Sequence, residues 1–292
     1  MMKKPLFTGA CTALVTPFLG DDLNLPMLDR LLARQWEAGI SAVVLGGTTG
    51  EAPTLSDREK LTLFRRGKAA LEGRGLLIAG TGSNSTAHAV VLSRAAEEAG
   101  ADALLVVSPY YNKATPDGIV AHYASIAAAV SIPVIVYNVP GRTGLDIPVS
   151  VYRQLARIPN IAGVKEASSD VTKVTRIRAA CGDGFAVWTG CDELTVPAMA
   201  LGAAGVISVA SNIRPEEVAA MADAVLDGDL DTAAALQAAL QPLNELLFCE
   251  VNPIPVKEML TAMGWDCGGC RLPLCPPTEE HRQQIHAFLK SR

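Results

Sequence analysis

One lysine at the end of an apolar segment is the residue of this sequence that most suggests chemistry. In NIAGVKEASSD, residues 160–170, the stretch from Ile161 to Val164 is typical of a buried strand, and Lys165 follows directly. A strand-end lysine commonly lays its stem on apolar surface and its amine in water. A desolvated lysine instead has a lowered pKa and becomes a nucleophile toward a carbonyl carbon. Position alone leaves both interpretations open.

Other side chains with chemical capacity also follow apolar segments. GGTTGE follows residues 41–47, and its glycines let the backbone approach a ligand closely. Exposed backbone N–H groups there, with the hydroxyls of Thr48 and Thr49, suit a carboxylate or a phosphate. An ordinary loop is the alternative.

Tyrosines and an arginine belong to the same set. Tyr110 and Tyr111 follow one segment, Tyr137 lies within the next, and Arg142 follows it in a Pro–Gly turn. Aromatic packing and a solvated arginine are the ordinary alternatives. In combination with Lys165, however, a phenol provides the proton relay that Schiff-base formation needs. An arginine nearby would bind an anionic second substrate through a bidentate contact.

Short apolar segments alternate with helical patterns along most of the chain. The segments read as continuously apolar, which is typical of strands buried on both faces. They are residues 9–17, 41–47, 75–82, 101–109, 132–140, 161–167, 185–192 and 204–211. Eight such units predict a (β/α)8 TIM barrel, an α/β fold, over residues 1–228. An open doubly wound sheet is the alternative, but no G-x-G-x-x-G follows any segment. A barrel gathers the strand ends, and hence the candidate residues, at one mouth.

The helical patterns carry their own start and stop signals. Ser56 with Glu59 three residues later is a capping box, and glycine closes the EAG sequences that precede strands. Beyond residue 228 only helical patterns remain. We therefore predict a helical C-terminal domain over residues 229–292.

Composition excludes several classes of function. Hydrophobic residues make up 49% of the 292 residues, charged residues 19%, and the formal net charge is −5. This balance is not that of a nucleic-acid-binding protein. No run of about 18 apolar residues exists, so no membrane span is expected. The N-terminal residues 1–18 resemble a signal peptide, but polar interruptions and Pro17 favour a first strand, and we expect a cytoplasmic protein.

Seven cysteines are present, and three of them lie close together in DCGGCRLPLC. Cys267, Cys270 and Cys275 form this group, and the nearest histidine is His281. A structural zinc site needs four ligands. We expect free thiols in a loop and no metal.

Six motifs together resemble one known family. GGTTGEAPTL, SPYYNK, YNVPGRTG, GVKEAS, GVISVASN and NPIPVKEML are similar to motifs of the dihydrodipicolinate synthases, also called 4-hydroxy-tetrahydrodipicolinate synthases. The resemblance runs from about Thr8 to Pro277. The wider group of pyruvate-dependent lyases, including N-acetylneuraminate lyase, shares the barrel, the lysine and the tyrosine. The double threonine and the arginine of NVPGRTG mark the synthases, and this chain has both.

The resemblance implies roles for the catalytic residues. Lys165 would form a Schiff base with pyruvate. Tyr137 would relay protons in a hydrogen-bonded triad with Thr49 and Tyr111. Tyr111 would reach across the tight dimer interface of a homotetramer, a dimer of dimers.

The resemblance also implies how substrates are held. Thr48 and Thr49 would bind the pyruvate carboxylate, and Arg142 the carboxylate of L-aspartate 4-semialdehyde. Gly190 and Ile207 would line the pocket through backbone groups. The implied reaction is the pyruvate condensation of lysine and diaminopimelate biosynthesis, without metal or organic cofactor.

One part of the resemblance is a departure. Feedback-inhibited members bind lysine in a crevice between subunits, and the candidate effector pocket here is made by Asn84, His88, Lys60 and Tyr110. A cationic Lys60 would repel the ligand's ammonium groups, and His88 supplies no fixed negative charge. We therefore predict weak or absent inhibition by lysine.

Two other functions remain as alternatives. A sister lyase acting on another 2-keto acid, such as a sugar acid, would not need Arg142. A non-catalytic keto-acid sensor on a retained barrel would not need the lysine, tyrosine and threonines together. Imine formation with pyruvate separates the sensor from both enzymes.

Overall fold

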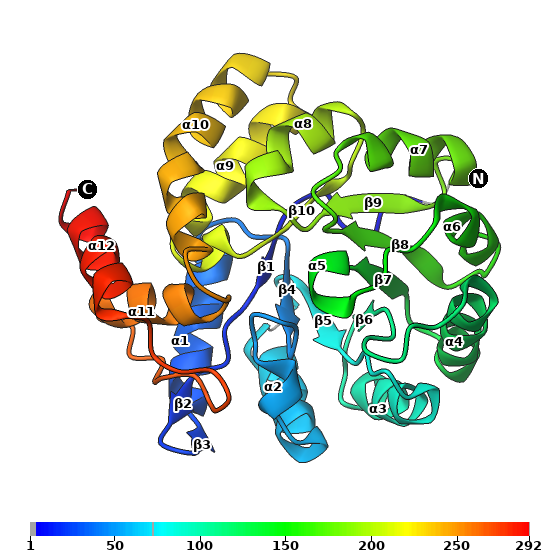
Figure 1. Cartoon of the computed structure of the whole chain (residues 1–292), viewed down its shortest axis with the longest axis horizontal. Helices are drawn as coiled ribbons and strands as arrows, with labels where there is room; N and C mark the ends of the chain where they lie inside the picture. Colours follow the sequence, from blue (N-terminus) through cyan, green and yellow to red (C-terminus); the bar gives the residue numbers. More distant parts are fainter. Residues whose placement is uncertain (1–3, 72, 292) are drawn as a thin grey trace.

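The computed structural model describes residues 4–71 and 73–291 and contains a closed barrel of parallel strands (Figure 1). The order around the barrel is β1-β10-β9-β8-β7-β6-β5-β4. The strands are β1 (Gly9–Ala13), β4 (Ala42–Leu45), β5 (Leu76–Gly80), β6 (Ala103–Val107), β7 (Val134–Asn138), β8 (Ile161–Glu166), β9 (Ala186–Thr189) and β10 (Gly205–Ser208). Each lies within one of the eight apolar segments, so the predicted barrel is confirmed.

Burial on both faces explains why the strands read as continuously apolar. Along β7, Val134 and Val136 pack in the layer between the barrel and its helices, whereas Ile135 and Tyr137 pack inside the barrel. Successive side chains of a strand point to opposite faces, so both faces here demand apolar residues. A polar residue in such a strand therefore faces either the mouth of the barrel or the helix layer.

Helices surround the barrel, as Figure 1 shows. They are α1 (Leu25–Glu37), α2 (Asp57–Leu71), α3 (Thr86–Glu98), α4 (Pro116–Ala129), α6 (Val149–Leu155), α7 (Thr172–Cys181), α8 (Thr195–Ala200) and α9 (Pro215–Leu226). The short α5 (Pro140–Thr143) follows β7 and lies near the centre of the view in Figure 1. The capping box predicted for α2 is confirmed. The Ser56 backbone N–H donates to Glu59 at 2.8 Å, and the Glu59 N–H donates to the Ser56 hydroxyl at 3.3 Å.

The C-terminal region is helical, as predicted. It contains α10 (Leu230–Leu247), α11 (Ile254–Ala262) and α12 (Glu279–Lys290), which lie together beside the barrel in Figure 1. Asp229 caps α10 by accepting from the Thr232 N–H at 3.1 Å. The division between residues 228 and 229 stays a prediction, because α10 also packs against α8 and α9 of the barrel.

Short elements in the loops were not predicted. β2 (Phe18–Leu19) and β3 (Asp22–Leu23) form a hairpin after β1, and the 3-10 turns η1 (Ala52–Thr54), η2 (Asp192–Leu194) and η3 (Ala210–Asn212) follow strands. Two-residue strands carry too little periodicity to be recognised in a sequence. In the described ranges, no helix is both long and apolar enough to cross a membrane.

Candidate active site

Strand alternation directs Lys165 into the barrel mouth. Residues of β7 and β8 pair in register, Tyr137 with Lys165 and Asn138 with Glu166. Tyr137 packs inside the barrel, and Lys165 follows it to the same side, with its amine 4.6 Å from the centre of the phenol ring. Lys165 is 5% exposed. A cation at this distance from an aromatic face is attracted by the ring.

The next residue of the strand faces the opposite way and is held by polar partners. Glu166 accepts from the Asn138 amide at 2.8 Å and from the Tyr152 hydroxyl at 3.1 Å. The Lys173 amine lies 3.4 Å from its carboxylate. Glu166 is therefore occupied behind the barrel wall, and its negative charge does not pair with Lys165.

No hydrogen bond or ion pair holds the Lys165 amine among residues 4–71 and 73–291. One acid that interacts electrostatically with Lys165 is Asp192, which is buried and accepts from the Ser208 hydroxyl and, at 2.9 Å, from the Val209 N–H. Burial raises the pKa of Asp192, and the charge of Lys165 acts in the opposite direction. Burial also raises the pKa of the Cys11 thiol inside the barrel. Within the described chain, the amine thus lies at the barrel mouth without a paired acid.

Position 190 needs a glycine because the Lys165 side chain packs directly against it. A Cβ atom at this position would lie 2.7 Å from Lys165 Cε and 2.8 Å from the Ala167 Cβ. Such contacts are too short for any side chain. The Gly190 N–H donates to the Glu166 carbonyl at 2.8 Å, which fixes the turn after β9.

Asn252, which was not predicted as a site residue, contacts both Thr49 and Arg142. Thr49 is 2% exposed and accepts from the Asn252 side-chain amide at 3.0 Å. Arg142, on the short helix α5, donates to the Asn252 carbonyl at 3.1 Å. The Asn252 Oδ1 is buried and has no hydrogen-bond partner in the described part of the chain. NPIPVKEML carried the resemblance, but nothing in its spacing indicates a contact with a residue 203 positions away.

These groups open onto one cavity of about 710 Å³ at the barrel mouth. It is lined by Lys165 and by residues of the loops after β4, β7 and β9, and α10 contributes its rim. The predicted members that line it are Thr48, Thr49, Tyr137, Arg142, Lys165 and Gly190, together with Asn252. A nucleophilic amine, a phenol, hydroxyls and a guanidinium around one cavity suit imine chemistry on a substrate with a carboxylate.

The side chains of two other predicted site residues do not line this cavity. Ile207 is fully buried inside the barrel and does not line the cavity with its side chain. Tyr111 is 90% exposed, and its φ of +72° is in the left-handed region that non-glycine residues seldom adopt. Within the described chain, no hydrogen bond joins Thr49, Tyr137 and Tyr111 into a triad.

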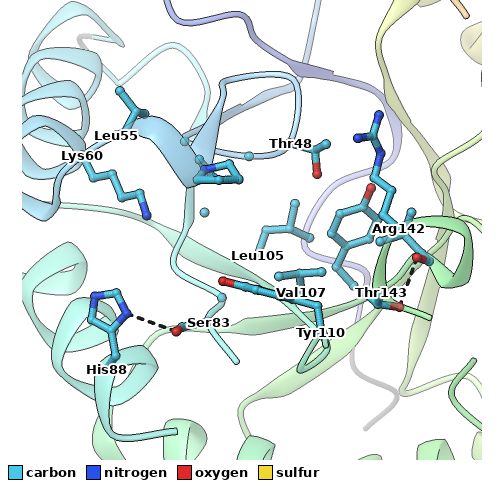
Figure 2. A pocket seen from close by; sticks show the side chains of 18 of the residues that line it. Thr48, Leu55, Lys60, Ser83, His88, Leu105, Val107, Tyr110, Arg142 and Thr143 are labelled. Atoms are coloured by element: carbon cyan, nitrogen blue, oxygen red, sulfur yellow. Dashed lines mark hydrogen bonds between the residues drawn. The ribbon is translucent and has the colours of Figure 1, made fainter. Parts of the chain in front are cut away.

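A second cavity of about 450 Å³ lies beside the first (Figure 2). Three members of the predicted effector pocket, Lys60, His88 and Tyr110, line it, and Asn84 does not. Thr48, Tyr137 and Arg142 line both cavities. Asp57, which was not among the predicted residues, also lines this cavity, and its carboxylate lies 2.9 Å from His88 Nε2.

The cysteines form no disulfide and no metal-binding cluster in the described part of the chain. All seven are free thiols, and burial raises the pKa of Cys267 and of Cys270 to about 12. In the described ranges, no group of three or more His, Cys, Asp or Glu side chains has an arrangement that would hold a metal ion.

Comparison with known proteins gives the family. The model of the dihydrodipicolinate synthetase family matches residues 6–292. The 4-hydroxy-tetrahydrodipicolinate synthase of Acetivibrio thermocellus is 44% identical over 289 residues, which cover 99% of this chain and 98% of that protein.

Solved structures agree with this. The chloride-inhibited dihydrodipicolinate synthase of Acinetobacter baumannii, complexed with pyruvate, is 42% identical with a TM-score of 0.95, covering 97% of this chain and 98% of that one. The enzyme of Cyanidioschyzon merolae with lysine bound is 38% identical with a TM-score of 0.95, covering 99% of both chains. The chain belongs to the dihydrodipicolinate synthase family.

Proposed function

We propose that this chain condenses pyruvate with L-aspartate 4-semialdehyde, the reaction of a 4-hydroxy-tetrahydrodipicolinate synthase. Membership of the family supports the reaction. The single observation that carries it is the buried Lys165 amine, which no acid of residues 4–71 and 73–291 holds and which lies 4.6 Å from the Tyr137 ring centre. A lysine amine that is not tied to a carboxylate is positioned to add to a ketone carbon.

The chemistry proceeds through an imine on Lys165. The amine adds to the pyruvate carbonyl carbon, and the carbinolamine loses water to give an iminium. Loss of a methyl proton then gives an enamine, whose carbon attacks the aldehyde of the second substrate. Tyr137 relays the protons in these steps, assisted by Thr49. Release of the product by hydrolysis or by cyclisation restores the free amine.

Substrate binding uses the rest of the mouth. Thr48 and Thr49 bind the pyruvate carboxylate, and Arg142 binds the carboxylate of the aldehyde substrate. Backbone groups of Gly190 and Ile207 complete the pocket. The Asn252 contacts to Thr49 and Arg142 support this assignment, because one residue keeps both carboxylate-binding groups in place.

The assembly we propose is a homotetramer whose tight dimer completes the site. Tyr111 projects from the chain with 90% of its surface exposed. A strained backbone is usually retained for a function. In the proposed dimer, Tyr111 enters the site of the neighbouring subunit and joins the proton relay there.

A coupled assay tests the function. The protein is mixed with pyruvate, aspartate 4-semialdehyde and dihydrodipicolinate reductase, and the loss of NADPH is followed. We expect turnover that disappears when either substrate is omitted. Absence of turnover, with a pyruvate adduct still formed on Lys165, would contradict the synthase and leave a sister lyase. Absence of both would leave the keto-acid sensor.

A further inference from the structure

The GGTTGE loop ends in a buried acid whose two carboxylate oxygens are both held by the C-terminal region. Glu51 is 2% exposed. The Lys257 amine donates to its Oε1 at 2.7 Å, and the Arg271 backbone N–H donates to its Oε2 at 2.9 Å. The Lys257 amine also donates to the Gly269 carbonyl at 2.8 Å. These contacts join the loop after β4 to residues of α11 and of the segment that follows α11.

The backbone of Glu51 has a conformation that needs such a restraint. Its φ of +57° and ψ of +40° lie in the left-handed region, which non-glycine residues seldom adopt. A strained residue persists where the surrounding structure holds it. The Glu51 N–H donates to the Thr48 carbonyl at 3.0 Å, and the Ala52 N–H donates to the Gly47 carbonyl at 3.1 Å. The turn that presents Thr48 and Thr49 therefore ends in the residue that the C-terminal region holds.

The surroundings of the ion pair restrict its geometry further. The Lys257 amine lies 4.2 Å from the centre of the Phe18 ring, and the Arg271 guanidinium carbon lies 4.2 Å from the same centre. Arg271 also donates from Nη1 to the Thr54 carbonyl at 3.0 Å, just beyond Glu51 in the chain. A buried ion pair stabilises a fold no better than well-packed apolar side chains of similar volume, but its directed hydrogen bonds can fix one geometry.

The acid acts on the mouth cavity through its neighbours in sequence. Thr48 and Thr49 line that cavity, whereas Glu51 does not. Its carboxylate is engaged by the C-terminal region and does not touch a substrate bound in the cavity. We propose that Glu51 is a positioning residue, which holds Thr48 and Thr49 in the geometry that binds the pyruvate carboxylate. This inference rests on the proposed function, because that function assigns the carboxylate to the two threonines.

Displacement of the threonines should weaken binding more than the chemical step. Lys165 and Tyr137 lie on β8 and β7 and stay in register with each other when the loop after β4 moves. The carboxylate would lose hydrogen bonds that it makes in the ground state and in the transition state alike, and such a loss appears in KM. In the coupled assay, the pyruvate KM should therefore rise by a larger factor than kcat falls.

Pyruvate titrations of Lys257→Met and of its double variant with Glu51→Gln test the positioning role. Each protein is mixed with increasing pyruvate, reduced by a brief pulse of borohydride, and its adduct is quantified by intact mass. Lys257→Met should raise the half-maximal pyruvate concentration by about tenfold. The double variant removes the unpaired charge and should recover part of the stability, measured by urea denaturation. It should not recover the pyruvate affinity, because the amide has no cation to hold it.

Lys68→Met is the matched control. Its amine lies 2.6 Å from Asp102, near the other end of α2, so the substitution also breaks an ion pair. The pyruvate dependence of this variant should equal that of the wild type. An affinity loss as large as that of Lys257→Met would show a general effect of ion-pair loss and would overturn the positioning role.

Two further results would overturn the positioning role. One is an unchanged pyruvate dependence of Lys257→Met. The other is a double variant in which pyruvate affinity returns together with stability, because Glu51 would then act on the fold alone. If Lys257→Met does not fold, Glu51→Gln takes its place beside the double variant, with the same expected loss of affinity and the same contrary result.

The wild-type protein separates this inference from the proposed function. If it forms no pyruvate adduct at any concentration, the proposed function fails and the positioning role falls with it. If it forms the adduct and every variant has the wild-type pyruvate dependence, only the positioning role fails.

Discussion

Two of the buried lysines in the described chain differ in what surrounds their amines. Lys257 is 2% exposed, pairs with Glu51 at 2.7 Å and donates to the Gly269 carbonyl at 2.8 Å. Lys165 is 5% exposed and lies over Tyr137 without a paired acid in the described chain. Burial alone therefore does not make a lysine reactive. The Lys257 amine is held by its acid partner, whereas the unpaired Lys165 amine lies beside the Tyr137 phenol at the barrel mouth, where imine chemistry needs both groups.

The largest expected effect comes from removing the unpaired amine. Lys165→Ala should abolish turnover in the coupled assay, because no other described amine faces the mouth cavity. Lys257→Ala also removes a buried lysine. This variant should still form the imine under conditions in which it is folded. Turnover by Lys165→Ala near the wild-type rate would show that the unpaired lysine is not the nucleophile.

Removing the phenol beneath the lysine should have the next largest effect. Tyr137→Phe keeps the ring that Lys165 faces and deletes the hydroxyl. We expect kcat to fall by about 10²–10⁴, the usual range for loss of a general acid–base group. Circular dichroism should show the wild-type fold. An unchanged kcat would exclude Tyr137 from the proton relay.

The paired lysine should matter to stability rather than to the chemical step. Lys257→Met leaves the buried Glu51 charge without its cation, although the Arg271 backbone N–H still donates to it, and this should lower the free energy of unfolding by about 3 kcal/mol. Urea denaturation measures this, and Glu51→Gln added to Lys257→Met should recover part of the loss. Lys165→Met should leave stability unchanged or raised. Equal losses of unfolding free energy in Lys257→Met and Lys165→Met would show that the two lysines do not differ in their contribution to stability.

The smallest expected effect concerns a buried group outside both lysine sites. His122 on α4 is 3% exposed, and burial lowers its pKa from 6.5 to about 4. The unfolded chain therefore binds a proton between these values that the folded chain does not. Stability from this group is complete above pH 6.5 and is lost as the pH falls toward 4.

Thermal melts from pH 7.5 to 4.5 measure the His122 contribution. His122→Gln should show a shallower decline of melting temperature with falling pH than the wild type. The Thr86 hydroxyl, 2.9 Å from His122 Nδ1, offers the glutamine a partner. Parallel declines in the two proteins would exclude His122 as the source of the acid sensitivity.

The barrel was predictable because its signal is local. Strands such as β7, buried on both faces, give continuous apolar segments, and the capping box of α2 spans four residues. Placement of Lys165 at a strand end followed from the same segments. The inward direction of Lys165 and the outward direction of Glu166 required the register with β7, which no local spacing contains.

Long-range contacts account for what the sequence did not predict. Asn252 meets Thr49 and Arg142, and Asp57 meets His88, only after the chain has folded. Lys60 and His88 are therefore not the only charged or titratable groups of that cavity, because Asp57 lines it as well. Weak or absent inhibition by lysine stays a prediction, now supported by the engagement of Asp57 with His88.

Location of the pyruvate adduct tests the central claim most directly. Protein incubated with pyruvate and reduced with borohydride is digested, and the modified peptide is mapped by mass spectrometry. We predict a single reduced adduct on Lys165, with the buried Lys257 and Lys60 unmodified. An adduct on either of those lysines, or none at all, would contradict the claim that an unpaired amine at the barrel mouth is the nucleophile.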